Sequence, residues 1–63
     1  MRIALYDRLL IDGGIWKCTG VWLRGKEVSR YELLDISNKE LRDVSPEQLT
    51  EGFKKGKIKH FNT

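Results

Sequence analysis

The chain has 63 residues, of which 40% are hydrophobic and 33% are charged, and its formal net charge is +3 at pH 7. So short a chain buries only about 60% of the surface that it exposes when unfolded, which predicts a single domain over residues 1–63 and excludes two separate cores. The composition excludes a disordered chain, and the single cysteine and single histidine exclude an intrachain disulfide and a Cys/His zinc site.

The single cysteine and the N-terminal residues indicate the cellular compartment of the protein. A single free thiol is typical of a reducing compartment. The N-terminal segment has no apolar stretch of signal-peptide length, because Asp7 and Arg8 interrupt it, and no segment approaches the roughly 20 apolar residues that a transmembrane helix needs. We therefore expect a cytoplasmic protein that does not bind a membrane.

The first third of the chain fits two local structures. Apolar residues at positions 3, 5, 9 and 11 alternate as in a strand, whereas those at 3, 6 and 10 follow a helical stripe. Asp12-Gly13-Gly14 is typical of a hairpin turn, and residues 15–23 are rich in aromatic and β-branched side chains. The hairpin favours strands, and residues 2–11 are expected as one bent strand, two strands or a short helix.

Two further extended segments follow the first turn. Within residues 15–23, alternation places Trp16, Cys18 and Trp22 on one face together with Gly20. A glycine in mid-strand predicts a bulge or a close backbone approach, and a bulge would move every later residue to the opposite face. A turn at residues 24–27 and a third extended segment at residues 28–36, ending in a polar turn, complete an antiparallel meander.

The strongest local signal marks the start of a helix. Ser45 is a typical N-cap, Pro46 suits the first helical position, and Gln48 completes a capping box with Ser45. Gly56 is a typical left-handed helix stop. The sequence therefore predicts a helix from Pro46 to about Lys55.

Short extended segments flank this helix. Residues 41–44 are a candidate strand before it, and residues 57–61 alternate as in a final strand after it. Together these patterns predict an α+β fold, in which a small antiparallel β-meander of about three to five strands packs with one short C-terminal helix.

The second half of the chain carries three motifs in a fixed order. They are Tyr31-x-Leu33-x-Asp35, Val44-x-Pro46-x-Gln48-Leu49 and Lys55-Gly56-Lys57-Ile58. In this respect the chain resembles small uncharacterised proteins encoded by phages and mobile elements of Gram-positive bacteria. The resemblance implies a fold and assigns no activity.

The sequence contains few side chains that form a candidate catalytic set. Catalysis needs a positioned acid, base or nucleophile with a supporting group, and Cys18 with His60 would supply a pair only if the first hairpin met the last strand. Free cysteines are among the most buried residues, which favours Cys18 as a core residue. Asp12-Gly13-Gly14 lacks the spacing and ending of a phosphate-binding loop. We expect no enzyme, no cofactor and no metal.

The first candidate binding surface is basic. Residues 1–51 carry 8 basic and 9 acidic side chains, whereas residues 52–63 carry four lysines and no acid. Lysines beside an aromatic ring can hold phosphates and stack a base. Alternatively, they complement a helix C-terminus and keep an edge strand from pairing. The set comprises Lys54, Lys55, Lys57, Lys59, His60 and Phe61.

The second candidate surface consists of Trp16, Trp22 and Tyr31, because tryptophan and tyrosine are enriched at protein interfaces and in stacking platforms. A domain of this size also needs its largest side chains in the core, so the alternative for each of these three residues is a place in the core.

By elimination, the sequence predicts a small non-catalytic binding or regulatory protein that acts through contact with another protein. An exposed sheet edge offers strand addition, either to a partner or to a second copy in a homo-oligomer. The alternative function is a nucleic-acid-binding module that uses the basic C-terminal strand and the Trp-bearing hairpin.

Overall fold

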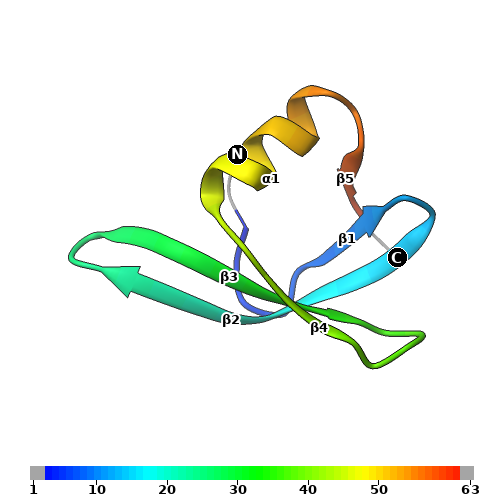
Figure 1. The fold of residues 1–63 in the computed structure, drawn as a ribbon, viewed down its shortest axis with the longest axis horizontal. Helices are drawn as coiled ribbons and strands as arrows, with labels where there is room; N and C mark the ends of the chain where they lie inside the picture. Colours follow the sequence, from blue (N-terminus) through cyan, green and yellow to red (C-terminus); the bar gives the residue numbers. More distant parts are fainter. Residues whose placement is uncertain (1–2, 62–63) are drawn as a thin grey trace.

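The computed structural model describes residues 3–61, which form a single antiparallel sheet and one helix. The elements in chain order are β1 (Arg8–Ile11), β2 (Gly14–Arg24), β3 (Glu27–Asp35), β4 (Leu41–Val44), α1 (Pro46–Lys54) and β5 (Ile58–His60). The strand order is β4-β3-β2-β1-β5. The meander therefore ends at one edge of the sheet, and α1 leads the chain across to the other edge (Figure 1). The predicted α+β class is confirmed.

The segment before β1 is a turn attached to β2. The amide of Tyr6 donates to the carbonyl of Cys18 at 2.7 Å, and the amide of Cys18 donates to the carbonyl of Asp7 at 2.8 Å. Residues 3–7 are thus neither helix nor strand, and residue 2 lies outside the described residues. The strand alternation expected from position 3 is wrong up to Asp7, because Tyr6 adopts a left-handed conformation with φ of 73°.

The first hairpin turn has the geometry that its residues predict. Asp12 and Gly13 have φ values of 50° and 79°. Positive values at both central residues define a type I′ turn, whose twist matches that of the two strands it joins. The predicted hairpin is confirmed, with Ile11 opposite Gly14 in the register.

A β-bulge reverses the faces of β2. The pairing of β2 with β3 shifts register between Cys18 and Gly20, which leaves Thr19 as the extra residue. Simple alternation, which put both tryptophans on one face, is therefore wrong beyond the bulge, as expected for a bulge near Gly20. Trp16 lies on the face that packs against α1, and Trp22 lies on the opposite face. We call these the inner and outer faces.

The core occupies the inner face. Leu9, Leu33, Leu49 and Cys18 are almost completely shielded from solvent, and they come from four different elements. The helix contributes Leu49, with Phe53 packed against the edge of this cluster. The other buried residues are Ile3, Trp16, Tyr31, Ile58 and, among the polar side chains, Asp35.

The helix begins as its sequence predicts and ends within one residue of the expected position. The amide of Gln48 donates to Oγ of Ser45 at 3.1 Å, and the amide of Ser45 donates to Oε1 of Gln48 at 2.9 Å. Gly56 has φ of 75°, and the amide of Lys57 donates back to the carbonyl of Gly52. These bonds satisfy backbone groups that the helix ends would otherwise leave unpaired.

Gly52 lets α1 approach β5. A Cβ built on Gly52 would lie 2.6 Å from Cγ1 of Ile58 and closer still to its Cδ1. Replacing glycine by alanine within a helix normally gains about 1 kcal/mol. Here the added methyl group would push apart a helix and a strand that already touch, which costs about 1–3 kcal/mol.

The gain and the cost together lead us to expect that Gly52→Ala lowers the free energy of unfolding by up to about 2 kcal/mol, measured by urea denaturation. Thr50→Ala is the matched control, because Thr50 is exposed on the same helix and alanine should stabilise it by a few tenths of a kcal/mol. Equal stabilisation by both substitutions would contradict this account of the helix position.

Candidate binding surfaces

Two of the three predicted aromatic site residues are buried. Tyr31 is only 6% exposed and belongs to the core, so its place on a binding surface is corrected by the structure. Its position on the inner face of β3, opposite Val44, explains this burial. Trp16 is 9% exposed, but part of its ring lines a surface pocket.

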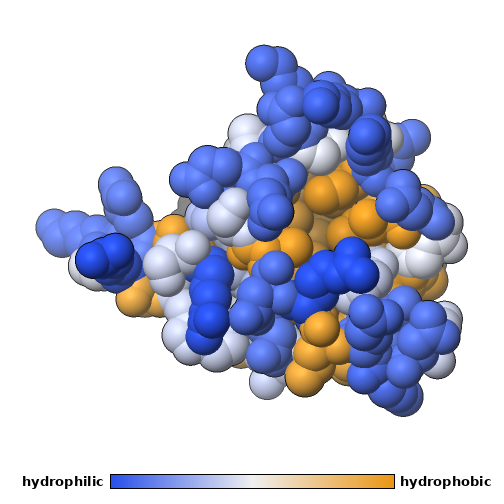
Figure 2. Space-filling view, viewed as in Figure 1, coloured by the Kyte–Doolittle hydropathy of each residue, from blue (hydrophilic) through white to orange (hydrophobic). Residues whose placement is uncertain are grey.

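This inner-face pocket has a volume of about 220 Å³ and lies between α1, β4 and the β1–β5 edge of the sheet. Figure 2 shows apolar side chains open to solvent in the hollow beside the helix. Its apolar wall is formed by Ile11, Trp16, Leu33, Val44, Leu49 and Ile58. Sequence patterns did not reveal this pocket, because its wall combines side chains from six separate elements.

Arg42 marks the rim of the inner-face pocket. Its guanidinium Cζ lies 5.2 Å from the centroid of the Trp16 ring, which is within the range of a cation–π contact. One of its nitrogens lies 3.5 Å from Oε1 of Glu40, an exposed and long ion pair. The pocket thus combines an apolar wall with a guanidinium group at its mouth.

The predicted C-terminal basic set does not form one surface. Lys54 and Lys55 lie at the end of α1, where Lys55 pairs with Glu51 at 3.1 Å. Lys57 and Lys59 lie on the other side of Gly56, in a hollow of about 260 Å³ next to the first hairpin turn. Lys57 also lines a second hollow with Lys55, Glu47 and Glu51 beside the helix, so it lies between the helix end and Lys59.

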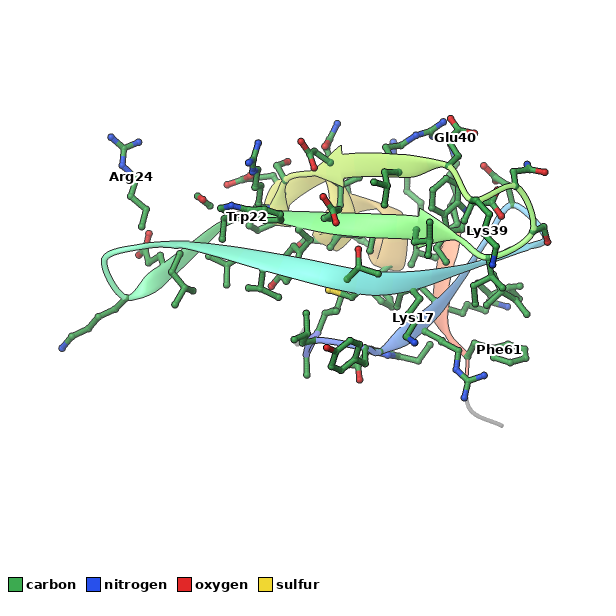
Figure 3. All side chains as sticks on the ribbon, turned by 90° about the horizontal axis from the view of Figure 1, so that it is seen from below. Lys17, Trp22, Arg24, Lys39, Glu40 and Phe61 are labelled. Atoms are coloured by element: carbon green, nitrogen blue, oxygen red, sulfur yellow. The ribbon has the colours of Figure 1, made fainter. Side chains whose placement is uncertain are left out.

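The lysines near β5 join two cations that the sequence did not group with them. Lys59 is opposite Leu10 and Arg8 is opposite Lys17, so these residues share the outer face of three neighbouring strands. We define the basic face as Arg8, Lys17, Lys57 and Lys59 with the aromatic residues Tyr6 and Phe61. Figure 3 shows Lys17 and Phe61 on the same side of the sheet, far from Arg24 at the hairpin tip.

The aromatic residues border the cations of the basic face. Nζ of Lys17 lies 5.3 Å from the centroid of the Tyr6 ring. The amide of Phe61 donates to the carbonyl of Arg8 at 3.0 Å, which continues the β1–β5 ladder beyond His60. Phe61 is therefore placed next to Arg8, and no local sequence signal links these two residues.

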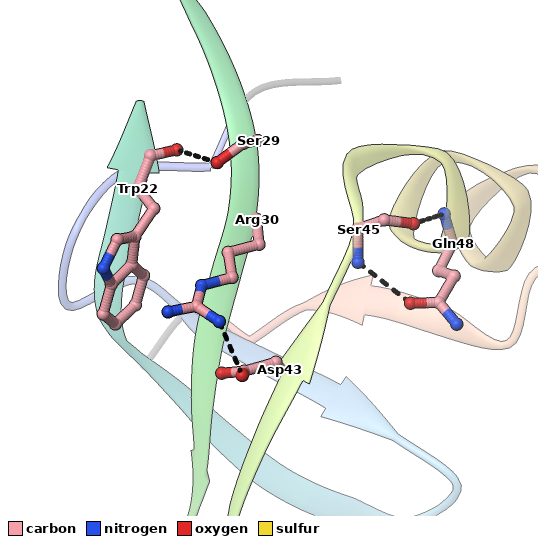
Figure 4. A network of polar contacts seen from close by, with 6 residues as sticks. All are labelled: Trp22, Ser29, Arg30, Asp43, Ser45 and Gln48. Atoms are coloured by element: carbon pink, nitrogen blue, oxygen red, sulfur yellow. Dashed lines mark hydrogen bonds and ion pairs between the residues drawn. The ribbon is translucent and has the colours of Figure 1, made fainter. Parts of the chain in front are cut away.

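Trp22 lies on the outer face, where its ring stacks against Arg30, and it is 40% exposed. The guanidinium of Arg30 lies 4.5 Å from the centroid of its ring and pairs with Asp43 at 3.2 Å (Figure 4). The ring also lies close to Gly20, where an added Cβ would lie 2.7 Å from Cη2 of Trp22. The lack of a side chain at Gly20 thus allows the Trp22 ring to lie close to the backbone, and Gly20 also lies beside the bulge.

Cys18 and His60 are positioned apart from each other. The Cys18 thiol donates to the carbonyl of Gly20 at 3.5 Å, whereas the His60 ring packs on Phe53 with centroids 5.1 Å apart. Strand β1 separates β2, which carries Cys18, from β5, which carries His60. Within residues 3–61 no group of three or more histidine, cysteine or acidic side chains is close enough to hold a metal ion.

Burial controls the chemistry of Cys18. Desolvation raises the pKa of its thiol above the usual value of 9.0, the carboxylates of Asp7 and Glu32 act in the same direction, and the hydrogen bond to Gly20 opposes them. The folded protein therefore keeps this proton at a pH at which the unfolded chain has lost it. As a result, the contribution of Cys18 to stability falls as the pH rises above 9.0.

We expect iodoacetamide to modify Cys18 slowly in the native protein and rapidly in concentrated urea, as followed by mass spectrometry. The free energy of unfolding should also decline from neutral to alkaline pH more steeply in the original protein than in Cys18→Ala, which removes this titration along with the packing of the sulfur. Equally rapid modification of native and unfolded protein would show that the thiol is accessible.

Comparisons with known proteins assign no function to these surfaces. No family model, curated protein or solved structure matches the chain. The one helix in the described part of the chain is too short and too polar to cross a membrane.

Proposed function

We propose that this protein is a small non-catalytic docking module that binds an extended segment of another protein at the inner-face pocket and along the edge of β4. The observation that carries this proposal is that the pocket borders an edge of β4 that pairs with no strand among residues 3–61. The mobile-element origin suggested by the sequence motifs and a cytoplasmic location belong to the same proposal.

The size of the pocket suits a protein side chain. Its volume of about 220 Å³ is below the roughly 300–1,000 Å³ of typical small-molecule sites. An aliphatic or aromatic side chain inserted there would cover Ile11 and Val44, the two residues of the apolar wall that α1 leaves half-buried. Burial of one such anchor contributes roughly 1.5–3 kcal/mol, and a few anchors of this kind dominate most protein interfaces.

A partner strand added along β4 would lie over the pocket. In the described sheet β4 pairs only with β3, so its other side can accept an added strand. Arg42 and Val44 are opposite Leu33 and Tyr31, so both belong to the inner face. Every second side chain of a segment added along β4 would therefore point towards the pocket.

Arg42 gives the site a preference for acidic segments. A guanidinium has five donors, and the contact with Glu40 at 3.5 Å uses one nitrogen at long range. A carboxylate of the partner can form charge-assisted hydrogen bonds with the remaining donors. The preferred partner is then an extended segment in which an aliphatic or aromatic residue lies close to an aspartate or glutamate.

This preference can be tested with a displayed library of random peptides as the probe. We expect selected peptides to combine an apolar anchor with a nearby acidic residue, and Arg42→Glu to weaken their binding about tenfold to a hundredfold in calorimetry. Arg24→Glu is the matched control, since it makes the same charge change at the exposed hairpin tip and should leave the affinity unchanged.

Two outcomes would overturn the proposal. Selected peptides that bind Arg42→Glu and the original protein equally well would place docking elsewhere. A concentration-dependent dimer, seen by size-exclusion chromatography and dissociated by Arg42→Glu, would assign the β4 edge to a second copy of this chain instead of a different protein.

A further inference from the structure

We propose that the basic face is a second, independent binding site, for the backbone of single-stranded nucleic acid. It lies on the outer face of β1, β2 and β5, on the opposite side of the sheet from the inner-face pocket. The inference does not depend on the docking function proposed above.

The positive charges of this face are gathered by the sheet register. Lys17, Arg8 and Lys59 come from three adjacent strands, which are spaced about 4.8 Å apart. Lys57 extends the row through the hollow that it shares with Lys59. A polyanion crossing the three strands would therefore meet the three lysines in succession, beside Arg8, and phosphate contacts by lysine and arginine supply most of non-specific nucleic-acid affinity.

The carboxylates nearest to the basic face only partly offset its charge. Oδ2 of Asp7 accepts a hydrogen bond from the amide of Ala4, and Oε1 of Glu32 accepts one from Thr19, both at 2.9 Å. Asp12 lines the hollow with Lys57 and Lys59 and is the carboxylate that most directly opposes an anion. Four cations against these three carboxylates leave the face with a formal charge of +1.

The aromatic residues supply surfaces on which bases can stack. Tyr6 is 65% exposed beside Lys17, and its φ of 73° is a costly conformation for a bulky residue. That backbone geometry presents the ring on the surface instead of burying it. Phe61 borders the opposite end of the face, next to Arg8. Stacking on such rings contributes about 1–3 kcal/mol per base and tolerates any sequence.

The shape of the face favours a single strand over a duplex. Duplex DNA is read mainly by a helix or a two-stranded ribbon that enters the major groove. The only helix of the described residues packs on the inner face, so it cannot reach a ligand bound to the basic face. A sheet surface with the exposed Tyr6 ring and the half-buried Phe61 ring instead suits unpaired bases, which leave their faces free to stack.

The test is fluorescence anisotropy with a labelled oligothymidylate of about 12 nucleotides, within the site size of known single-strand binders. Three phosphate contacts, one for each lysine, would weaken the affinity about 20-fold between about 50 and 200 mM salt. A duplex of the same length should bind more weakly than the single strand.

Charge variants locate the site. We expect the double variant Lys17→Glu with Lys59→Glu to lose at least about tenfold in affinity and to show a shallower salt dependence. Arg24→Glu with Lys26→Glu makes the same net charge change at the hairpin tip and should have a small effect. Asp12→Asn should strengthen binding severalfold, because asparagine suits the type I′ turn and removes the opposing charge.

Several results would overturn the inference. The inference fails if oligothymidylate does not bind at low salt, or if the two double variants lose the same affinity. It also fails if a poly-glutamate peptide binds equally tightly and with the same salt dependence, which would indicate a general polyanion surface. Arg42→Glu should leave oligothymidylate binding unchanged, so that failure here and failure of the protein-docking proposal can be told apart. Circular dichroism on each variant confirms that the fold is retained.

Discussion

The β-bulge at Thr19 is the constraint on which the division of the large apolar side chains between the two faces of the sheet depends. With unbroken alternation, Trp16, Cys18 and Trp22 would all face α1, and the inner face would have to accommodate two indole rings. The extra residue instead returns Val21 to the core and turns Trp22 to the outer face, where Gly20 and Arg30 hold its ring. Bulges also increase the local twist of a sheet. One inserted residue thus divides the large apolar side chains between a core and a surface.

The short helix explains why the inner face is not fully covered. Nine helical residues span about 13 Å at 1.5 Å per residue, whereas five strands span about 19 Å at a spacing near 4.8 Å. Leu49 fills the middle of the core, and Gly52 brings the end of the helix against Ile58. The uncovered part beside β4 remains as the inner-face pocket. Its apolar wall and the charged outer face suit different partners, which is why we assign them separate functions.

The sequence was most informative where structure depends on neighbouring residues. Ser45 and Gln48 define the helix start through bonds that span three residues, and Asp12-Gly13 defines a turn by its own backbone preferences. Both surfaces depend instead on strand register. Lys17 and Lys59 share a face only because β1 pairs with β2 on one side and with β5 on the other. Likewise, the turn at Tyr6 arises from hydrogen bonds to Cys18, which no local pattern encodes.

The most direct test of this account is the exposure of the two tryptophans, measured separately. Trp16→Phe and Trp22→Phe each leave one indole, whose emission and quenching by acrylamide report its contact with water. We expect the indole at position 22 to emit at longer wavelength and to be quenched several times more efficiently than the indole at position 16, in line with their exposed fractions of 40% and 9%. Equal quenching of the two indoles, or stronger quenching at position 16, would contradict the bulge and with it the division into inner and outer faces.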